Sequence, residues 1–389
     1  MPVTPAEWLT PERRATIFYF SIFMGAGAST AYGGIWFKDQ GLDAGQIGII
    51  GSLPVFIILL INVFVGRVAD RASDWRQVIT IGAVLSGIIT VGLFFSHGFL
   101  PILLIWTLAT VPANVVNPVL DAATMRMTRR NGTDYGVIRA WGTIGYLVAI
   151  VATGFAVQWL GSAAYLPLFV GVALLRGVLA FQLPNFRAPV REQGANVAGR
   201  LREVMKPWFL LPLVGWAMVF ATHLILNTFQ ALLWSEQGIP AFTIALLVAV
   251  GAAAEASMMW LFKHVATRFP ARRLILISAI VSVLRWVAMG FAPDVPVLFA
   301  MQLLHSVTFA MGFMGCVNFI ANWTSEDIAA EAQSFFQVLQ LAMATVAVFA
   351  FGYLAQAWHA QAYFASAAFA AIGAVLIFAS MRMMQPKPH

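Results

Sequence analysis

Long apolar runs, separated by short polar segments, repeat along the whole chain. Each run has about 20 residues, the length of helix that crosses the hydrocarbon core of a bilayer. The pattern predicts an all-α membrane protein with twelve transmembrane helices. Their expected ranges are 14–37, 46–66, 77–96, 100–125, 136–160, 163–183, 208–235, 242–263, 271–292, 295–322, 331–356 and 360–383.

A polar segment over residues 185–207 divides these helices six and six. We predict an N-terminal six-helix bundle over 1–184, a cytoplasmic linker over 185–207 and a C-terminal six-helix bundle over 208–389. The halves also share a weak repeat, because Gly66-Arg-Val-Ala-Asp70-Arg71 follows the second helix and Lys263-His-Val-Ala-Thr-Arg268 follows the eighth. Two related bundles around a central cavity suit binding near the bilayer midplane and alternating access by rocking.

The composition agrees with a membrane location. The 389 residues are 60% hydrophobic and 10% charged, whereas soluble domains carry about 25% charged residues. The formal charge of +7 comes from lysines and arginines spread through short loops, which argues against a nucleic-acid partner. The single cysteine, Cys316, excludes an intramolecular disulfide and a cysteine metal cluster.

The basic loops fall mainly on one side of the predicted membrane. Cytoplasmic loops hold an excess of Lys and Arg, so we expect both termini and the linker in the cytoplasm, with the chain in a bacterial inner membrane. Arg176 lies about seven residues from the cytoplasmic end of its predicted helix. We expect its long side chain to snorkel to that interface.

An acid and an arginine interrupt two neighbouring apolar helices. Asp121 lies in the fourth predicted helix and Arg139 in the fifth, with a short basic hairpin between them. If the helices pack antiparallel, the two side chains reach a similar depth on neighbouring walls. An ionisable residue inside a membrane helix costs about 2.5–3.5 kcal/mol on insertion scales, so it faces a partner, a cavity or a pathway. We predict that Asp121 and Arg139 bind a solute; a buried structural ion pair is the alternative.

Further polar residues form stripes, because positions i, i+3, i+4 and i+7 of a helix share one face. Lipid cannot satisfy polar groups, so each stripe faces protein or a wet cavity. Interhelical hydrogen bonding is the alternative to solute binding for amides and histidines, and tryptophan often marks the membrane interface. The residues that we add to the predicted solute site are Asn117, Trp141, Tyr146, His223 and Asn227.

The C-terminal half holds a second group of ionisable residues. Glu255, Arg285 and His305 lie on three successive predicted helices. Histidine has an unperturbed pKa of about 6.5 and therefore titrates near neutral pH. We predict that these three residues couple protons to solute movement, and a packing role is the alternative for His305.

Twelve helices split six and six, with Gly66-x-x-x-Asp70-Arg71 in the second loop, resemble the major facilitator superfamily. The loop motif departs from the family at Ser73, where a glycine is expected. The resemblance implies that Gly66, Asp70 and Arg71 belong to a loop that stabilises one conformation of the protein.

The segment from Asp121 to Tyr146 is similar to the fourth and fifth helices of lactose permease and its oligosaccharide:proton symporter relatives. In that family the acid and the arginine bind the sugar, so the resemblance gives these roles to Asp121 and Arg139 and makes Tyr146 an aromatic platform. Arg285 and His305 match the arginine and histidine of the family's ninth and tenth helices.

Two departures argue against a simple transfer of the sugar substrate. Glu255 lies about one helical turn from the family's eighth-helix acid, and Thr308 replaces its tenth-helix carboxylate. Leu304-His-Ser-Val-Thr-Phe309 and Tyr135-Gly-x-x-Arg139-x-Trp141-Gly are more similar to the phenylpropionate-permease branch of the superfamily.

These observations predict a secondary active transporter that takes up a small organic solute with protons, with an aromatic carboxylate favoured. A sugar, glycoside or nucleoside symporter, an uncoupled facilitator or exchanger, and a non-transporting membrane sensor are the alternatives. We expect a monomer in the lipid bilayer, with no cofactor or metal. No Ser/His/Asp set, metal cluster or phosphate loop indicates an enzyme.

Overall fold

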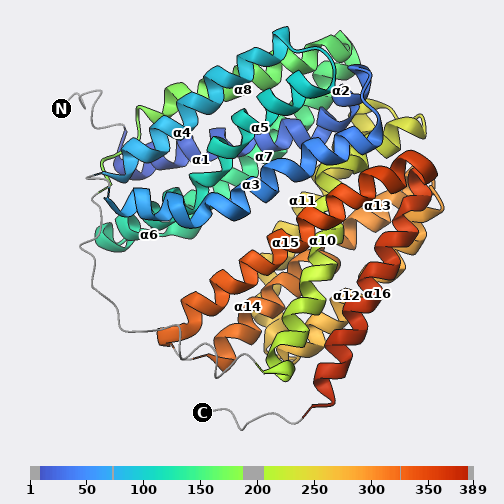
Figure 1. Cartoon of the computed structure of the whole chain (residues 1–389). Helices are drawn as coiled ribbons and strands as arrows, with labels where there is room; N and C mark the ends of the chain where they lie inside the picture. Colours follow the sequence, from blue (N-terminus) through green and yellow to red (C-terminus); the bar gives the residue numbers. More distant parts are fainter. Residues whose placement is uncertain (1–8, 72–73, 187–205, 325, 384–389) are drawn as a thin grey trace. The chain divides into compact units, whose positions relative to one another are not determined.

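The computed structural model describes residues 9–71, 74–186, 206–324 and 326–383, and the side chains of residues 62–71 and 326–331 lie outside that description. Apart from short turns, the described chain is helical (Figure 1). It divides into two compact units. Unit 1 comprises Met1–Leu42, Leu53–Glu192 and Pro240–Leu246, and unit 2 comprises Asp43–Ser52, Gln193–Ile239 and Leu247–His389.

The helices of the first half run from α1 to α8. They are α1 (Pro11–Ala28), a π-helical turn (Ser29–Gly33), α2 (Gly34–Asp39), α3 (Ala44–Arg71), α4 (Trp75–Thr90), a 3-10 turn (Val91–Phe95), α5 (Phe99–Val115), α6 (Asn117–Asn131), α7 (Tyr135–Leu160), a 3-10 turn (Ser162–Ala164) and α8 (Tyr165–Ala180).

The helices of the second half run from α10 to α16. They are α10 (Pro207–Glu236), α11 (Ala241–Ala266), α12 (Ala271–Gly290), α13 (Val295–Leu303), a π-helical turn (Ser306–Met311), α14 (Gly312–Trp323), α15 (Glu326–Trp358), a 3-10 turn (His359–Ala362) and α16 (Tyr363–Met381).

Ten helical segments of the described chain are long and apolar enough to cross a membrane. Pro11–Asp39 is not among them, and one such stretch, Ala332–Met381, covers α15 from Ala332 onward together with α16. The prediction of an all-helical chain rich in membrane-length helices is confirmed. The count of twelve spans and the boundaries 1–184, 185–207 and 208–389 stay predictions.

Two of the predicted spans differ from the observed helices, one in where it ends and one in being broken in two. The second predicted span ends at residue 66, but α3 continues to Arg71, so the backbone of the Gly66–Arg71 motif is helical rather than part of a loop. The fourth predicted span is one helix, but the structure breaks it at Val116 between α5 and α6. Pro118 explains the break, because proline lacks the N–H that would continue the hydrogen-bond ladder.

The hairpin between α6 and α7 is encoded locally. Gly132 ends α6 in the left-handed conformation, with φ of 66°, which glycine adopts without strain. Asp134 then caps α7, and its Oδ1 accepts a hydrogen bond from the backbone N–H of Gly136 at 2.7 Å. The predicted hairpin between the Asp121 helix and the Arg139 helix is therefore confirmed.

Helices α1 and α7 approach each other through glycines. A Cβ added at Gly145 would overlap the backbone carbonyl of Phe20, and one at Gly27 would overlap the carbonyl of Tyr146. A Cβ at Gly142 would lie 2.6 Å from the Phe23 ring. Small residues permit such close helix contacts in membranes, and this contact fixes the position of Arg139 and Tyr146 relative to α1.

Replacing Gly145 with alanine should destabilise the protein strongly. The new Cβ meets backbone atoms of Phe20, which cannot rotate away as a side chain does, and overpacking of this kind costs about 1–3 kcal/mol. We expect a lower thermal unfolding midpoint in detergent. Gly171→Ala in α8 is the matched control, because nothing lies within 4 Å of a Cβ added there. Equal midpoints for the two variants would contradict this account of the contact.

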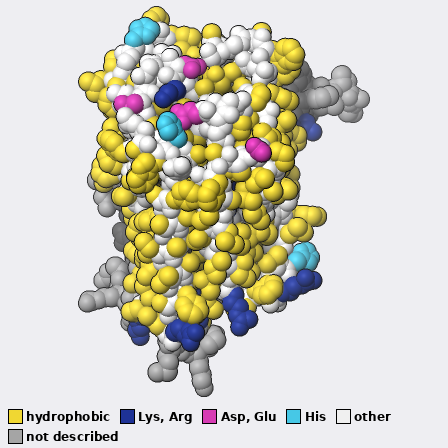
Figure 2. Space-filling view, turned by 90° about the vertical axis from the view of Figure 1, so that its right-hand side faces the viewer, with side chains coloured by type: hydrophobic (Ala, Val, Ile, Leu, Met, Phe, Trp, Pro, Cys, Tyr) yellow, Lys and Arg dark blue, Asp and Glu magenta, His cyan; other side chains and the backbone are white. Residues whose placement is uncertain are grey.

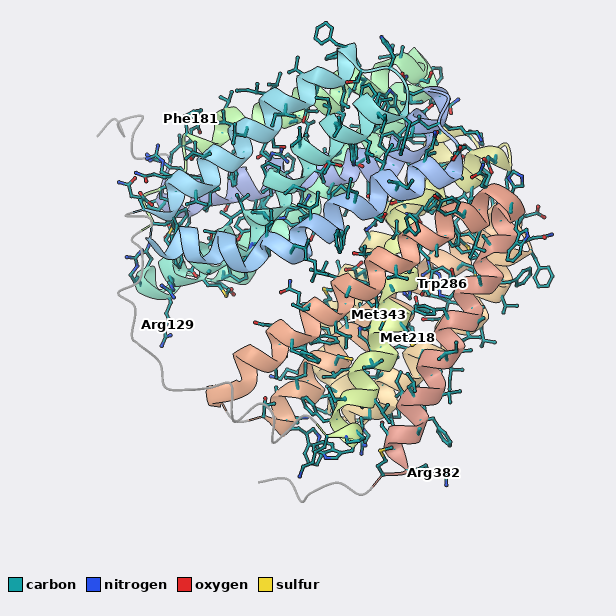
Figure 3. The ribbon with its side chains drawn as sticks, viewed as in Figure 1. Arg129, Phe181, Met218, Trp286, Met343 and Arg382 are labelled. Carbon is teal, nitrogen blue, oxygen red and sulfur yellow. The ribbon has the colours of Figure 1, made fainter. Side chains whose placement is uncertain are left out.

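Unit 2 is built around α10. Gly215 of α10 and Gly373 of α16 approach so closely that a Cβ on either residue would meet the other's carbonyl oxygen. Helices α12 and α16 run side by side in Figure 1. The Trp286 ring of α12 stacks on Tyr363 of α16, with ring centroids 5.7 Å apart, and Trp286 is labelled in Figure 3. This packing fixes the orientation of α12, and therefore of Arg285, relative to α16.

Apolar side chains cover the middle of the surface drawn in Figure 2, and basic side chains gather at its lower end. Within unit 2, helix ends that carry Arg272 and Arg382 lie together, because Arg272 Nη1 donates to the carbonyl of Ser380 at 3.0 Å. The other end of α10 carries Glu236, whose Oε2 lies 3.1 Å from His359 Nδ1. The apolar middle matches the surface that a bilayer requires.

Candidate functional site

The first cluster of polar residues lies in unit 1, where α1, α6 and α7 meet. Asp121 of α6 accepts two hydrogen bonds on Oδ1, from the Tyr19 hydroxyl at 2.6 Å and from the Tyr135 hydroxyl at 2.9 Å. The two tyrosine rings contact each other edge to face, with centroids 6.4 Å apart. Hydrogen bonds to a carboxylate are stronger than neutral ones, so this network fixes the position of Asp121.

Arg139 and Asp121 form no ion pair with each other among the described residues. Its guanidinium lies over the Phe23 ring of α1, with Cζ 4.1 Å from the ring centroid. The alternative of a structural ion pair is therefore not what the described residues show: Asp121 Oδ1 accepts from two tyrosine hydroxyls, and an aromatic face stabilises the Arg139 charge. The solute-binding role of the two residues stays a prediction. The guanidinium, which carries five N–H donors, makes no hydrogen bond to the described residues.

The other N-terminal residues of the predicted site occupy different surfaces. Tyr146 is half-buried in the α1–α7 contact near Arg139, seven positions further along the same helix face. Trp141 is 44% exposed and belongs to an apolar stripe with Val137, Ile144 and Val148, so it points away from Arg139. Asn117 begins α6 at the helix break, and its Oδ1 is buried without a hydrogen-bond partner.

The second cluster lies in unit 2 and is centred on Arg285, which is 0% exposed. Nη1 donates to His305 Nδ1 at 3.0 Å and to Thr308 Oγ1 at 3.1 Å. Nη2 donates to Gln302 Oε1 at 2.6 Å, and Gln302 Nε2 donates to the Leu247 carbonyl at 3.0 Å. The guanidinium is therefore held by neutral acceptors.

These contacts determine the protonation pattern of His305. An arginine can only donate, so Nδ1 of His305 must be the unprotonated acceptor nitrogen. Nε2 then carries the hydrogen, and it lies 3.3 Å from Glu255 Oε2. The side chains of His305 and Glu255 are 15% and 27% exposed. The structure thus links a partly accessible carboxylate, a neutral imidazole and a buried guanidinium in one chain of contacts.

A π-helical turn, Ser306–Met311, follows His305 directly. Such turns shift the register of a helix and often occur at functional sites. Here the turn contains Thr308, which reaches Arg285, and Phe309, whose ring stacks on the His305 imidazole with centroids 5.2 Å apart. The turn therefore supplies two consecutive residues that contact the cluster.

His223 of α10 completes the aromatic side of this cluster. Its ring lies 5.5 Å from the His305 ring and 4.9 Å from the Trp286 ring, measured between centroids. Its Nδ1 is 2.9 Å from the Val219 carbonyl, which can only accept, so Nδ1 carries the hydrogen. Nε2 is then a buried acceptor without a partner. Asn227, one turn further along α10, is exposed.

The fold and these clusters can be compared with known proteins. The sequence profile described as the MFS_1 like family matches residues 13–366. The chain belongs to this family. It is thus a member of the major facilitator superfamily of membrane transporters, and the resemblance inferred from the sequence is confirmed.

Relatives of this MFS_1-like protein carry different substrate names. It is 24% identical over 381 residues to the maltose permease of Geobacillus stearothermophilus, covering 96% of this chain and 93% of the relative. It is 26% identical to the probable 3-phenylpropionic acid transporter of Escherichia coli, covering 90% and 92%. The crystal structure of the nucleoside transporter NupG matches with a TM-score of 0.83 at 16% identity, covering 97% and 100%, which shows a shared fold.

One part of the predicted site of the MFS_1-like protein is not tested by the structure. The side chains of Gly66, Asp70 and Arg71 lie outside the described residues. Their role in stabilising one conformation stays a prediction.

The prediction that the Arg176 side chain snorkels to the cytoplasmic interface is wrong. Its side chain does not snorkel to the interface but is 7% exposed, and Nη2 donates to Ser86 Oγ of α4 at 2.5 Å. The hydroxyl reaches across from α4 because α4 and α8 pack against each other. The Ser86 hydroxyl on the neighbouring helix thus takes the place of the interfacial water that a snorkelling arginine contacts.

Four residues that contact the clusters were not assigned to the predicted site: Tyr19, Tyr135, Gln302 and Thr308. Gln302 and His305 share a helical face by spacing, which was the available signal for Gln302. The two tyrosines carry no such signal, because a tyrosine in an apolar helix is as compatible with core packing as with a hydrogen bond to a distant carboxylate.

Proposed function

We propose that this protein is a proton-coupled symporter that takes up a small organic solute across a bacterial inner membrane. Membership of a transporter family supports transport. The contacts between Glu255, His305 and Arg285 support proton coupling, because they join a group that can take up a proton to a fixed buried charge. This connected set is the observation that carries the proposal.

The coupling step follows from charge balance within unit 2. Ionised Glu255 offsets the positive charge of Arg285 through the neutral His305 bridge. Protonation of Glu255 removes that negative charge and leaves the buried guanidinium uncompensated, which raises the electrostatic energy of this arrangement. A conformation in which Arg285 finds another acceptor is then favoured, and proton loading thereby biases the conformational equilibrium.

An aromatic carboxylate is the solute class that we favour. Arg139 offers a guanidinium whose donors are unused by the described residues, directly beside the Phe23 ring. Arginine binds a carboxylate through two parallel hydrogen bonds, and the ring suits an aromatic group. Asp121, held by two tyrosines, fixes the local geometry, and Tyr146 and Asn117 remain proposed contributors, whereas Trp141 faces away from Arg139. The relative named as a probable 3-phenylpropionic acid transporter agrees with this class.

A neutral sugar or nucleoside is the second candidate, and one specific observation favours it. Nε2 of His223 is a buried acceptor without a partner, and a hydroxyl or N–H of a solute would satisfy it. An ionised carboxylate has no donor to offer. The relatives named as maltose permease and nucleoside permease agree with a solute rich in donors, and Asn227 would contribute an exposed amide.

The proposed topology places both termini in the cytoplasm. The basic ends of helices carry Arg129 on α6 and Arg382 on α16, which Figure 3 labels, and basic residues favour the cytoplasmic side. We retain the twelve spans in two six-helix bundles and the monomer as parts of this proposal.

The test is solute-driven proton movement in proteoliposomes. The purified protein is reconstituted, and 3-phenylpropionate, maltose or uridine is added to a weakly buffered medium while external pH and solute uptake are recorded. We expect the medium to alkalinise with one solute class, with an aromatic carboxylate expected first. Protein-free liposomes control for passive entry of the acid, and a protonophore should abolish accumulation. Uptake without alkalinisation would overturn symport and establish a facilitator or exchanger.

A further inference from the structure

A buried arginine outside both clusters has no counter-ion among the described residues. Arg176 of α8 is 7% exposed and lies where α8 packs against α1 and α4. Its single hydrogen bond to a described residue is the one from Nη2 to Ser86 Oγ, at 2.5 Å. No carboxylate of the described residues lies within ion-pair distance of it.

Such a charge cannot be removed by deprotonation. Arginine stays protonated in proteins, unlike a buried lysine or histidine, which can become neutral. Taking an ion of this size out of water costs several kcal/mol unless another charge and hydrogen bonds compensate it. Arg285, the other fully buried arginine described above, has acceptors on both Nη1 and Nη2, whereas Arg176 has one neutral hydroxyl.

Two hydrogen-bond donors at Arg176 and Ser86 have no acceptor among the described residues. Its Nε is buried without a hydrogen-bond partner. Ser86 Oγ accepts from the guanidinium, so the hydroxyl hydrogen of Ser86 must donate elsewhere, and no acceptor for it is found among the described residues. A positive charge with two unused donors beside it is the arrangement that binds an anion.

The Gly25 face of α1 is open next to the guanidinium. Outside the neighbouring residues of α1, a Cβ added at Gly25 would have only Arg176 Nη1 within 4 Å, at 3.8 Å. Gly25 and Phe23 lie two residues apart, about 200° around the helix axis. The space beside Arg176 is therefore on a different face of α1 from Phe23, where Arg139 lies.

We propose that Arg176 and Ser86, together with the Gly25 face of α1, form a binding site for a small monovalent anion, either chloride or a carboxylate group. The anion serves as the counter-ion of Arg176 and accepts hydrogen bonds from its guanidinium and from the Ser86 hydroxyl. It thereby stabilises the packing of α1, α4 and α8. The site is independent of the proposed transport mechanism.

The test is the anion dependence of thermal unfolding of the purified full-length protein in detergent. Sodium gluconate, whose anion is larger than chloride and acetate, is replaced by sodium chloride or sodium acetate at constant ionic strength. We expect a rise in the midpoint that saturates with concentration. A response to acetate but not to chloride identifies a carboxylate as the occupant, and a response to chloride but not to acetate identifies an inorganic anion.

Variants assign the effect to the site. Arg176→Gln should remove the anion dependence, and Ser86→Ala should weaken the apparent anion affinity at least about tenfold, since the bound anion loses one charge-assisted hydrogen bond. Arg382→Gln, which removes an arginine at the end of α16 that lies over Phe378, should keep the wild-type response. If Arg176→Gln does not fold, Ser86→Ala and anomalous scattering from bromide in wild-type crystals decide the matter.

The proposal is overturned if chloride and acetate both leave the wild-type midpoint unchanged. It is also overturned if Ser86→Ala or Arg176→Gln responds to these anions as the wild type does. Failure of this test leaves solute-driven alkalinisation unaffected, because that measurement depends on other residues.

Discussion

Arg139→Gln should reduce uptake of an aromatic carboxylate about 100-fold while the protein keeps its fold. The guanidinium stacks on Phe23 and has no hydrogen-bond acceptor among the described residues, so its five donors are available to a ligand. A carboxylate bound through two charge-assisted hydrogen bonds loses about 3 kcal/mol or more when both are removed. Arg139→Lys should also fail, because lysine cannot form the planar bidentate pair.

The measurement is initial uptake of labelled solute into proteoliposomes at concentrations below saturation. Arg126→Gln is the matched control, because Arg126 also lies over an aromatic ring, with Cζ 4.8 Å from the Trp75 centroid, and it is exposed on α6. We expect the control to keep uptake close to that of the wild type. Wild-type uptake and solute selectivity in Arg139→Gln would remove Arg139 from the site.

The positions of the helices were accessible from the sequence because apolar length and helical caps are local properties. The hairpin at Gly132 and Asp134 lies where the polar segment predicted it, since a left-handed glycine and an aspartate cap both act within a few residues. The break at Val116 was missed because apolar residues continue across it. A hydropathy pattern does not register the backbone effect of Pro118.

The partners of the interior charges were harder to predict than the charges themselves. Spacing placed Asp121 and Arg139 on neighbouring helices, but the choice between an ion pair and contacts with Tyr19 and Phe23 depends on α1. Tyr19 lies 102 positions from Asp121 in the sequence, and Phe23 lies 116 positions from Arg139. Long-range packing of this kind leaves no periodic pattern.

The partner of Arg176 was likewise not predictable from the residues near it in the sequence. Its distance from the helix end favoured snorkelling, a local rule, yet Ser86 of α4 provides a hydrogen-bond partner inside the unit. Nothing close to Arg176 in the sequence specifies Ser86. Local sequence patterns therefore predict which helices carry charged residues. Which of these charges has a hydrogen-bond or ion-pair partner depends on the three-dimensional packing.

Glu255→Gln should abolish solute-driven alkalinisation while leaving exchange of solute across the membrane. His305 accepts a hydrogen bond from Arg285 on Nδ1 and presents Nε2–H to Glu255. A second proton on His305 would have to occupy Nδ1, where it would face the Arg285 guanidinium and replace a hydrogen bond with charge repulsion. The transported proton is therefore expected on Glu255, and glutamine imitates the protonated form permanently.

The decisive comparison is with His305→Gln, which keeps a donor and an acceptor near Glu255 and Arg285 but has no titratable group. We expect this variant to retain alkalinisation at a reduced rate, whereas Glu255→Gln retains only counterflow of labelled solute against unlabelled solute. Both are measured in the same proteoliposomes with a pH electrode and labelled solute. The opposite result, coupling lost in His305→Gln and kept in Glu255→Gln, would place the proton on the histidine, and the hydrogen bond from Arg285 would then have to break in each transport cycle.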